Sequence, residues 1–251
     1  MRMWQVTLSA LMLFTQCVQA QWQGNWLVGA SGIYVQRRGE LDLSLRYSPV
    51  INFPRSFPNL EAQNRYTNKG FGAGVLAGYQ VKSQGWTWGL EGSVDWHDAD
   101  TPRDVVFTDV AGLFSWDAQS TYERDAIYAI SGRMAYEMAP YFIPYIRLGV
   151  EGSDDSLDLT LISSTPLISP NPITVSDSRW NWHYLAGVGV ETPLWDTAMT
   201  LRLEYIYHSR ASSLKPQGSL GLGLLNPAFT FVSDMHNRTQ SFKLSAVWNF
   251  S

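Results

Sequence analysis

Hydrophobic and polar positions alternate along residues 86–97. Every second side chain, from Trp86 to Trp96, is apolar or glycine, and the positions between them are polar or glycine. Successive side chains of a β-strand point to opposite faces, so the stretch predicts a strand with one apolar and one polar face. A strand of about twelve residues tilted by roughly 40° crosses a hydrocarbon layer of about 25–30 Å. Tryptophans at both ends of the apolar face match the aromatic girdles of membrane β-barrels.

Similar patterns recur in seven further segments, so about eight strands are predicted, as in the smallest single-chain membrane barrels. The further segments are residues 26–36, 70–81, 122–138, 141–151, 180–192, 199–208 and 238–250. The facing of residues 26–36 stays ambiguous. In residues 122–138 the pattern predicts one unbroken strand, with Tyr122 facing outward and Asp125 inward. The lipid-facing aromatic residues predicted in this way include Trp86, Trp88, Trp96, Trp182 and Tyr205.

The connections between these segments alternate in length. Three are short, at residues 82–85, 139–140 and 193–197, and four are long, at residues 37–69, 98–121, 152–179 and 209–237. Short periplasmic turns and long extracellular loops are typical of an up-and-down antiparallel barrel in an outer membrane. Residues 41–45 and 157–161 alternate inside two long connections, which favours strands that continue as hairpins above the membrane.

The N-terminus has the order of a secretory signal peptide: Arg2, a short apolar run, and small residues near Ala20. We therefore expect residues 1–20 to be cleaved and residues 21–251 to form one barrel domain. A lipoprotein signal at Cys17 is the alternative reading. The mature chain would hold no cysteine and hence no disulfide framework. Without Arg2, 17 of the 18 basic residues face 22 acidic ones, which argues against a nucleic-acid surface.

The polar faces of six predicted strands carry charged residues. An eight-stranded barrel has an interior only wide enough for side chains to fill, and charges buried there must pair. Counting from the short turns places most of these groups near one midplane layer. We therefore predict an ion-pair network that plugs the lumen, and the alternative is a gate that rearranges to pass water or ions. The predicted lumen residues are Glu91, Asp95, Arg133, Glu137, Arg147, Glu151, Glu191, Arg202, Glu204 and Lys243.

The C-terminal residues 243–250 resemble the assembly signal of bacterial outer-membrane proteins, with aromatic Trp248 and Phe250 two positions apart. Ser245, where glycine is usual, and Ser251, after the normally terminal Phe, depart from that pattern. Together with residues 26–32 and 144–150, the mature chain resembles the small OmpA/opacity-type surface barrels of Gram-negative bacteria. The resemblance implies an outer-membrane location, a similar internal ion-pair plug and no cofactor. The implied partners are outer-membrane lipid, lipopolysaccharide and the barrel-assembly machinery.

The expected function is that of a surface protein with envelope-structural and adhesive roles, whose long outer loops contact a host surface ligand. A narrow OmpW-type channel for small hydrophobic molecules or ions is the first alternative, since residues 220–231 are unusually apolar for a loop. A lipid A-modifying enzyme is the second, suggested by His208 beside Ser209. Adjacent strand residues point to opposite faces, so Ser209 is poorly placed to meet His208. We therefore expect no enzyme activity and no catalytic, cofactor or metal site.

Overall fold

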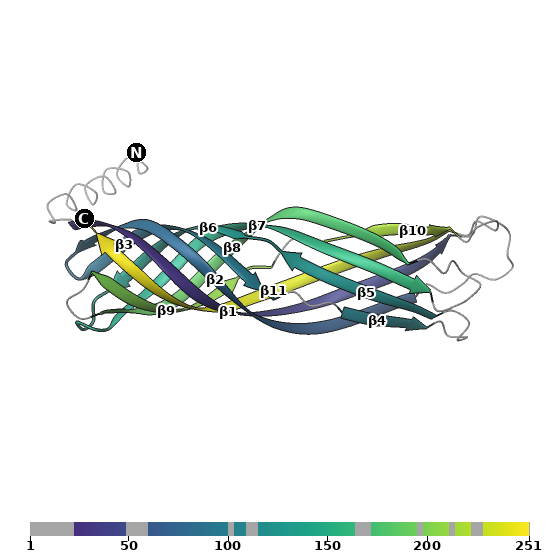
Figure 1. Ribbon diagram of the computed structural model, residues 1–251, viewed down its shortest axis with the longest axis horizontal. Helices are drawn as coiled ribbons and strands as arrows, with labels where there is room; N and C mark the ends of the chain where they lie inside the picture. Colours follow the sequence, from purple (N-terminus) through teal and green to yellow (C-terminus); the bar gives the residue numbers. More distant parts are fainter. Residues whose placement is uncertain are drawn as a thin grey trace, which may run out of the picture.

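The computed structural model describes residues 23–48, 60–99, 103–108, 115–163, 172–194, 198–210, 214–221 and 228–250, and the predicted signal peptide lies outside them. Eleven antiparallel strands within these ranges form one long cylinder (Figure 1). No helix in the described part of the chain is long and apolar enough to cross a membrane. The strands are β1 (Gln23–Ser48), β2 (Leu60–Ser83), β3 (Trp86–Asp98), β4 (Arg103–Thr108), β5 (Ser115–Arg124), β6 (Ile127–Tyr136), β7 (Ile143–Ser163), β8 (Ile173–Pro193), β9 (Met199–His208), β10 (Gln217–Gly221) and β11 (Ala228–Phe250).

Eight of these strands close into a ring in the order β1, β2, β3, β6, β7, β8, β9, β11. The ring closes where β1 pairs with β11, from Trp26 opposite Phe250 to Ser48 opposite Ala228. Closure leaves no free sheet edge in the ring, which is the condition for a sheet to span a hydrocarbon layer. β4 and β5 form a further pair that joins β7, and β10 joins β11. The predicted eight-stranded antiparallel barrel is confirmed.

Several strands are much longer than the predicted segments. β1 holds 26 residues and β2 holds 24, so each is on the order of 80 Å long at about 3.3 Å per residue. Large parts of the predicted outer loops are therefore strand, as the alternation in residues 41–45 and 157–161 indicated. We call the following parts the outer extension: β4, β5, β10 and residues 37–48, 60–69, 153–163, 173–179 and 228–238.

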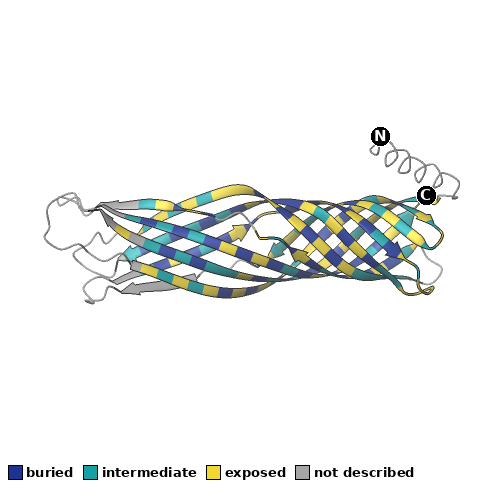
Figure 2. Ribbon diagram, turned by 180° about the vertical axis from the view of Figure 1, so that it is seen from behind, coloured by how far each residue is buried: buried dark blue, intermediate teal, exposed yellow. Residues whose placement is uncertain are grey.

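The distribution of apolar side chains reverses between the ring and the outer extension. In both parts, buried and exposed positions alternate along the strands (Figure 2). Near the start of β7, next to the short turn, outward Ile146 and Leu148 are exposed, while inward Arg147 is buried. Further along the same strand, Leu157 and Leu159 face inward and are completely buried. The outward apolar side chains form a band suited to lipid, and the extension has the polar exterior and apolar interior of a protein in water. The core of the extension includes Leu41, Tyr66, Tyr122, Leu157, Leu214 and Met235.

A β-bulge separates β5 from β6. Arg124 pairs with Asp155 and Tyr128 pairs with Gly152. Between these two pairs the β5–β6 side advances by four residues and β7 by only three, so the β5–β6 side has one extra residue. The amide N–H of Asp125, inside the bulge, donates to the carbonyl oxygen of Asp154 at 3.1 Å. The extra residue exchanges the two faces, so Tyr122 and Arg124 point inward and Asp125 is exposed. The prediction of one unbroken strand with Tyr122 outward and Asp125 inward was therefore wrong.

Two of the three predicted short turns lie within the described residues. Between β2 and β3, Gln84 and Gly85 form a two-residue loop with φ values of 52° and 80°. Positive φ at both central positions is the type I′ turn, whose twist matches the flanking strands. Pro140 and Tyr141 form the second loop, inside a bridge between Ala139 and Phe142. The third, residues 193–197, lies partly outside the described residues.

Replacing Leu157 by Ala tests the core of the outer extension. The change removes a completely buried side chain, so we expect the free energy of unfolding to fall by about 2–5 kcal/mol. Urea titration of the refolded barrel, followed by tryptophan fluorescence, measures the change. Asp154→Ala, at an exposed position of the same strand, is the matched control and should stay within about 0.5 kcal/mol of the parent. Equal losses in the two variants would contradict a packed core in this region.

Candidate functional site

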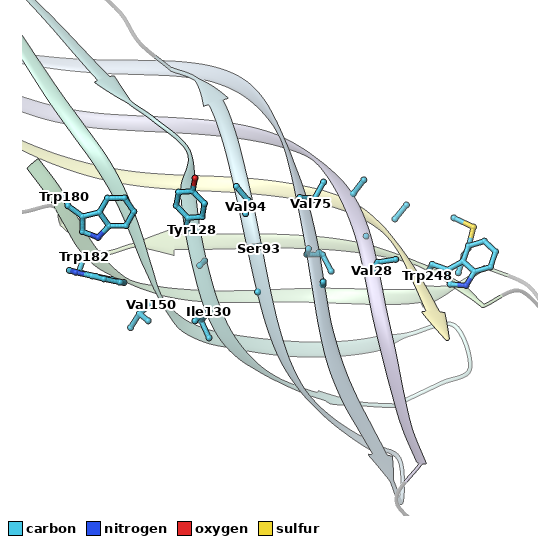
Figure 3. Close-up of a pocket in the computed structure, with 18 residues that line it drawn as sticks. Val28, Val75, Ser93, Val94, Tyr128, Ile130, Val150, Trp180, Trp182 and Trp248 are labelled. Atoms are coloured by element: carbon cyan, nitrogen blue, oxygen red, sulfur yellow. The ribbon is translucent and has the colours of Figure 1, made fainter. Parts of the chain in front are cut away.

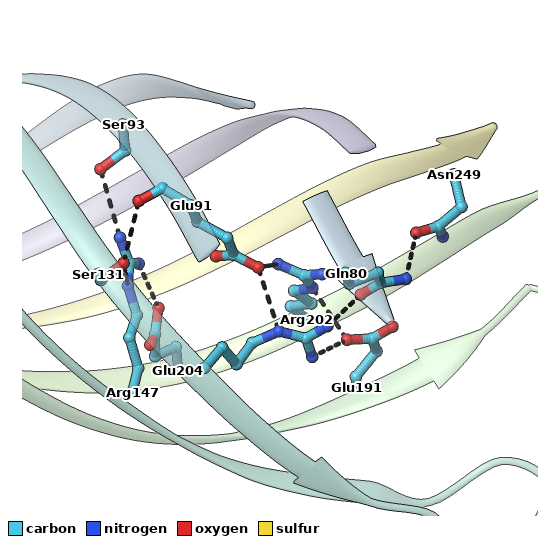
Figure 4. A network of polar contacts seen from close by, with 10 residues as sticks. Gln80, Glu91, Ser93, Ser131, Arg147, Glu191, Arg202, Glu204 and Asn249 are labelled. Atoms are coloured by element: carbon cyan, nitrogen blue, oxygen red, sulfur yellow. Dashed lines mark hydrogen bonds and ion pairs between the residues drawn. The ribbon is translucent and has the colours of Figure 1, made fainter. Parts of the chain in front are cut away.

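Two glutamates and two arginines form a closed square in the lumen, contributed by β3, β6, β8 and β9 (Figure 4). Arg202 contacts Glu91 at 2.8 Å and Glu191 at 3.0 Å. Arg133 contacts the same two carboxylates at 3.1 Å and 2.5 Å. All four side chains are buried. Each charge therefore has two partners of opposite sign, the arrangement that offsets the cost of removing ions from water.

A second group of polar contacts lies next to the square. Arg147 pairs with Glu204 at 3.2 Å and donates to the hydroxyls of Ser131 at 2.7 Å and Ser93 at 3.3 Å. Lys243 pairs with Asp95 at 2.6 Å. Together with the square, these two pairs bring four cations into contact with four carboxylates.

Glycines on the inner face make room for these side chains. A Cβ atom on Gly74 would lie 1.9 Å from Oδ1 of Asp95, and one on Gly187 would lie 2.8 Å from Oε1 of Glu204. Both distances are shorter than van der Waals contact. On the side of the square nearer the short turns, Gln80 accepts from Arg133 and donates to Asn249, while the Arg133 guanidinium lies 5.3 Å from the Tyr145 ring. The lumen is consequently filled from wall to wall at this height.

His208 lies between Glu151 and Ser241. Its Nδ1 is 2.7 Å from Oε1 of Glu151 and its Nε2 is 2.9 Å from the Ser241 hydroxyl. These are the pairings that a Ser-His-carboxylate site uses. Ser241 is only 4% exposed, however, so an acyl substrate could reach the hydroxyl only if the barrel opened. Ser209 is directed elsewhere, because its hydroxyl accepts the amide N–H of Tyr184 at 2.9 Å.

A further polar cluster lies above His208, at the base of the outer extension. Arg124 binds Asp155 through Nε at 2.8 Å and through Nη2 at 3.2 Å, and Asn181 donates to Asp155 at 2.9 Å. His183 lies against both, with its Nε2 at 3.1 Å from Nη2 of Arg124. Burial alone would raise the pKa of Asp155, but contacts with His183 and the charge of Arg124 hold it below its usual value of 3.8.

The structure brings most of the predicted lumen residues together but not Glu137. β6 ends at Tyr136, so Glu137 lies at the rim, where its partly exposed carboxylate pairs with Lys82 at 2.5 Å. Sequence reasoning did not select Gln80, Asn249, Arg124 or Asp155 for the site. Residues 153, 155 and 157 share one face of β7, and this alternation was a signal for Asp155. Arg124 gave no such signal, because the bulge shifts its facing.

The predicted lipid-facing aromatics lie on the outer wall. Trp86, Trp88, Trp96 and Trp182 are exposed, and Tyr205, which is partly covered, packs against Phe242 with ring centroids 5.1 Å apart. Trp248 and Phe250 of the predicted assembly signal are also exposed. A hollow of about 1000 Å³ lies along the outer surface of this wall, from Trp248 at one end to Trp180 and Trp182 at the other (Figure 3). It is lined almost wholly by apolar side chains, as expected of a surface that acyl chains cover.

Comparisons with known proteins agree with this architecture. The model of the outer membrane protein β-barrel domain family matches residues 6–250. No curated protein matches the chain. Among solved structures, the attachment invasion locus protein Ail of Yersinia pestis is 13% identical over 88% of this chain and 99% of its own, with a TM-score of 0.34.

Two other solved structures are similar to the chain. OprG of Pseudomonas aeruginosa is 11% identical over 87% of this chain and 96% of its own, with a TM-score of 0.38. The outer membrane protease OmpT of Escherichia coli is 10% identical over 89% of this chain and 97% of its own, with a TM-score of 0.35. At these scores the likenesses carry no argument about function.

Glu91→Gln tests the square of ion pairs. The change leaves Arg133 and Arg202 to share the single charge of Glu191, so we expect about 3–5 kcal/mol less stability. Equilibrium unfolding in lipid vesicles, followed by tryptophan fluorescence, gives the difference. The same substitution at the rim, Glu137→Gln, removes a partly exposed pair and should cost less than about 1 kcal/mol. Similar losses at both positions would show that burial of the square does not matter.

The Asp155 cluster predicts a dependence of stability on pH. A carboxyl whose pKa is lowered by folding stabilises the folded state above its unfolded pKa, and this stability is lost as the pH falls. The stability of the folded extension should therefore fall below about pH 4. Asp155→Asn should lower this stability at neutral pH and make it less dependent on pH below about pH 4. Limited proteolysis of the extension across this pH range is the measurement. The same loss of stability below about pH 4 in the variant as in the parent would contradict the assignment of this loss to Asp155.

Proposed function

Because this chain belongs to the outer membrane protein β-barrel domain family, we propose that it is a surface protein with a closed lumen and an adhesive outer extension. Its location is the bacterial outer membrane. The single observation that carries the proposal is the outer extension, which continues the barrel beyond the lipid-facing band as a packed body. A structural or transport role within the membrane does not require such a projection.

The filling of the lumen supports a closed barrel. The square around Glu91 and Arg202 is followed along the axis by the Arg147, Lys243 and His208 contacts. The apolar core of the extension then covers them. An ion would have to displace several paired charges and then cross an apolar layer, and both steps are costly. The network therefore acts as a structural plug.

The exterior of the extension supports contact with a surface outside the cell. Its outward positions carry charged and polar side chains, including Arg38, Asp42, Arg65, Lys69 and Asp154. Surface segments on a rigid scaffold are the usual place for recognition, because the scaffold holds them in fixed relative positions. The strands supply such a scaffold well above the lipid-facing band.

Adhesion is tested by expressing the protein in a non-adherent Gram-negative strain. We expect expressing cells to attach to cultured epithelial cells at least about tenfold more than vector cells. Replacing residues 49–59, 109–114, 164–171 or 222–227 by a short Gly-Ser linker, one at a time, should abolish attachment in at least one variant. A matched replacement of the short connection at residues 193–197, with equal surface amounts, should not. Attachment equal to that of vector cells would contradict the proposal.

Planar-bilayer recording tests the closed lumen against the alternative of a narrow channel. The reconstituted mature protein should give no stable conductance at neutral pH, whereas a general porin under the same conditions should conduct. A stable conductance that Arg133→Ala abolishes would contradict the plug and favour a channel.

A further inference from the structure

The backbone ladder of the barrel wall is interrupted between the β3–β6 pair and the β4–β5 pair. The β3–β6 ladder ends at Asp95 opposite Ile127, and the β4–β5 ladder begins at Arg103 opposite Ser120. Among the described residues between these two points, no backbone pair joins the two sides. The bulge at Asp125 lies at the same height and bonds to β7 on its other side. This interruption lies at the boundary between the lipid-facing band and the outer extension.

A cavity of about 380 Å³ occupies this place. Phe71 and Trp96, both exposed on the outer wall, line one side of it, with Phe71 75% exposed. His97 and Arg124, which belong to the interior, line the other. The cavity thus leads from the apolar surface of the barrel to the buried polar cluster.

Two buried groups at the inner end lack hydrogen-bond partners. Arg124 uses Nε and Nη2 for Asp155 and His183, but its Nη1 makes no hydrogen bond, and its side chain is only 2% exposed. Neither ring nitrogen of His97 has a partner. Buried donors without acceptors are rare and destabilising, so an acceptor that enters the cavity would be stabilised there. Arg37 lies close enough to act electrostatically on His97 and adds positive charge.

We propose that this opening binds a hydrocarbon carboxylate from the outer leaflet. The carboxylate accepts hydrogen bonds from Nη1 of Arg124 and from the His97 ring, and the hydrocarbon chain lies against Phe71 and Trp96. A charge-assisted contact to a buried guanidinium is the strongest type of hydrogen bond available there. This inference does not depend on the proposed adhesive role.

The charges at the mouth favour a carboxylate over a phosphate. Asp98 and Asp125 also line the cavity, and both are exposed. Together with Asp155 they outnumber the positive charges of Arg124 and Arg37, and this excess of negative charge repels a doubly charged phosphate more strongly than a singly charged carboxylate. Arg124 is already paired with Asp155, and a neutral head group would accept a weaker hydrogen bond from its Nη1 than a carboxylate does. The site therefore selects a singly charged head on an apolar chain.

Native mass spectrometry of the folded full-length mature protein, released from a zwitterionic detergent, tests the proposal with palmitate as the probe. We expect one palmitate per barrel. Ala126→Trp fills the cavity and should abolish binding, while His97→Ala should weaken it about tenfold. Ala77→Trp, at an exposed small residue on the outer wall away from the opening, is the matched control and should bind like the parent.

Competition separates the possible ligands. Hexadecanol, hexadecyl phosphate and inorganic phosphate should each displace palmitate at least about tenfold less effectively than unlabelled palmitate does. Equal competition by any of them would overturn the proposal, as would equal palmitate binding in all variants. If Ala126→Trp fails to show the heat-modifiable gel mobility of a folded barrel, His97→Gln decides. Because Gln keeps a donor, it should bind within about threefold of the parent, and a loss equal to that of His97→Ala would reject the site.

Discussion

The narrow interior of an eight-stranded ring is the constraint on which the rest of this structure depends. Side chains alone must fill it, so any inward charge has to find an opposite charge across the lumen. The square of Glu91, Glu191, Arg133 and Arg202 meets this condition with two partners for every ion. The register of the paired strands brings these residues, distant in sequence, to one height. Inner-face glycines such as Gly187 leave the space that the long side chains need.

The same strands fold in two solvents. Next to lipid, β7 turns Ile146 and Leu148 outward and Arg147 inward, and beyond the lipid it turns Leu157 and Leu159 inward. The backbone does not change, because its hydrogen bonds are made between strands in either medium. Only the side chains exchange roles. A barrel can therefore be lengthened out of the membrane without a new fold, provided that the apolar positions change face at the boundary.

Alternation predicted the ring because it reports a property of every strand residue, namely the face to which its side chain points. It selected the lumen charges of the ring for the same reason. It failed at Tyr122 and Asp125, since a bulge inserts a single backbone residue and leaves no mark in the side-chain pattern. It also failed at Glu137, which lies just beyond the end of β6 and therefore meets water rather than the lumen.

The extension was harder to predict than the ring. Its polar outer positions and its many turn-forming residues are also typical of loops, and only short runs such as residues 41–45 alternate clearly. Which strands pair at that distance from the membrane depends on register, and register passes up from the ring through unbroken β1 and β2.

An interrupted backbone ladder and buried polar groups without hydrogen-bond partners lie at the boundary between the lipid-facing band and the outer extension. On the strand pair where the facing changes, a bulge is one way to shift it by one residue, and that shift interrupts the ladder beside it. The groups just inside, Arg124 and His97, then lie where neither the ion pairs below nor the apolar core above supplies a full set of partners. A barrel that was polar inside throughout, or apolar inside throughout, would have no such place. The site proposed in the wall thus follows from the change of solvent along the strands.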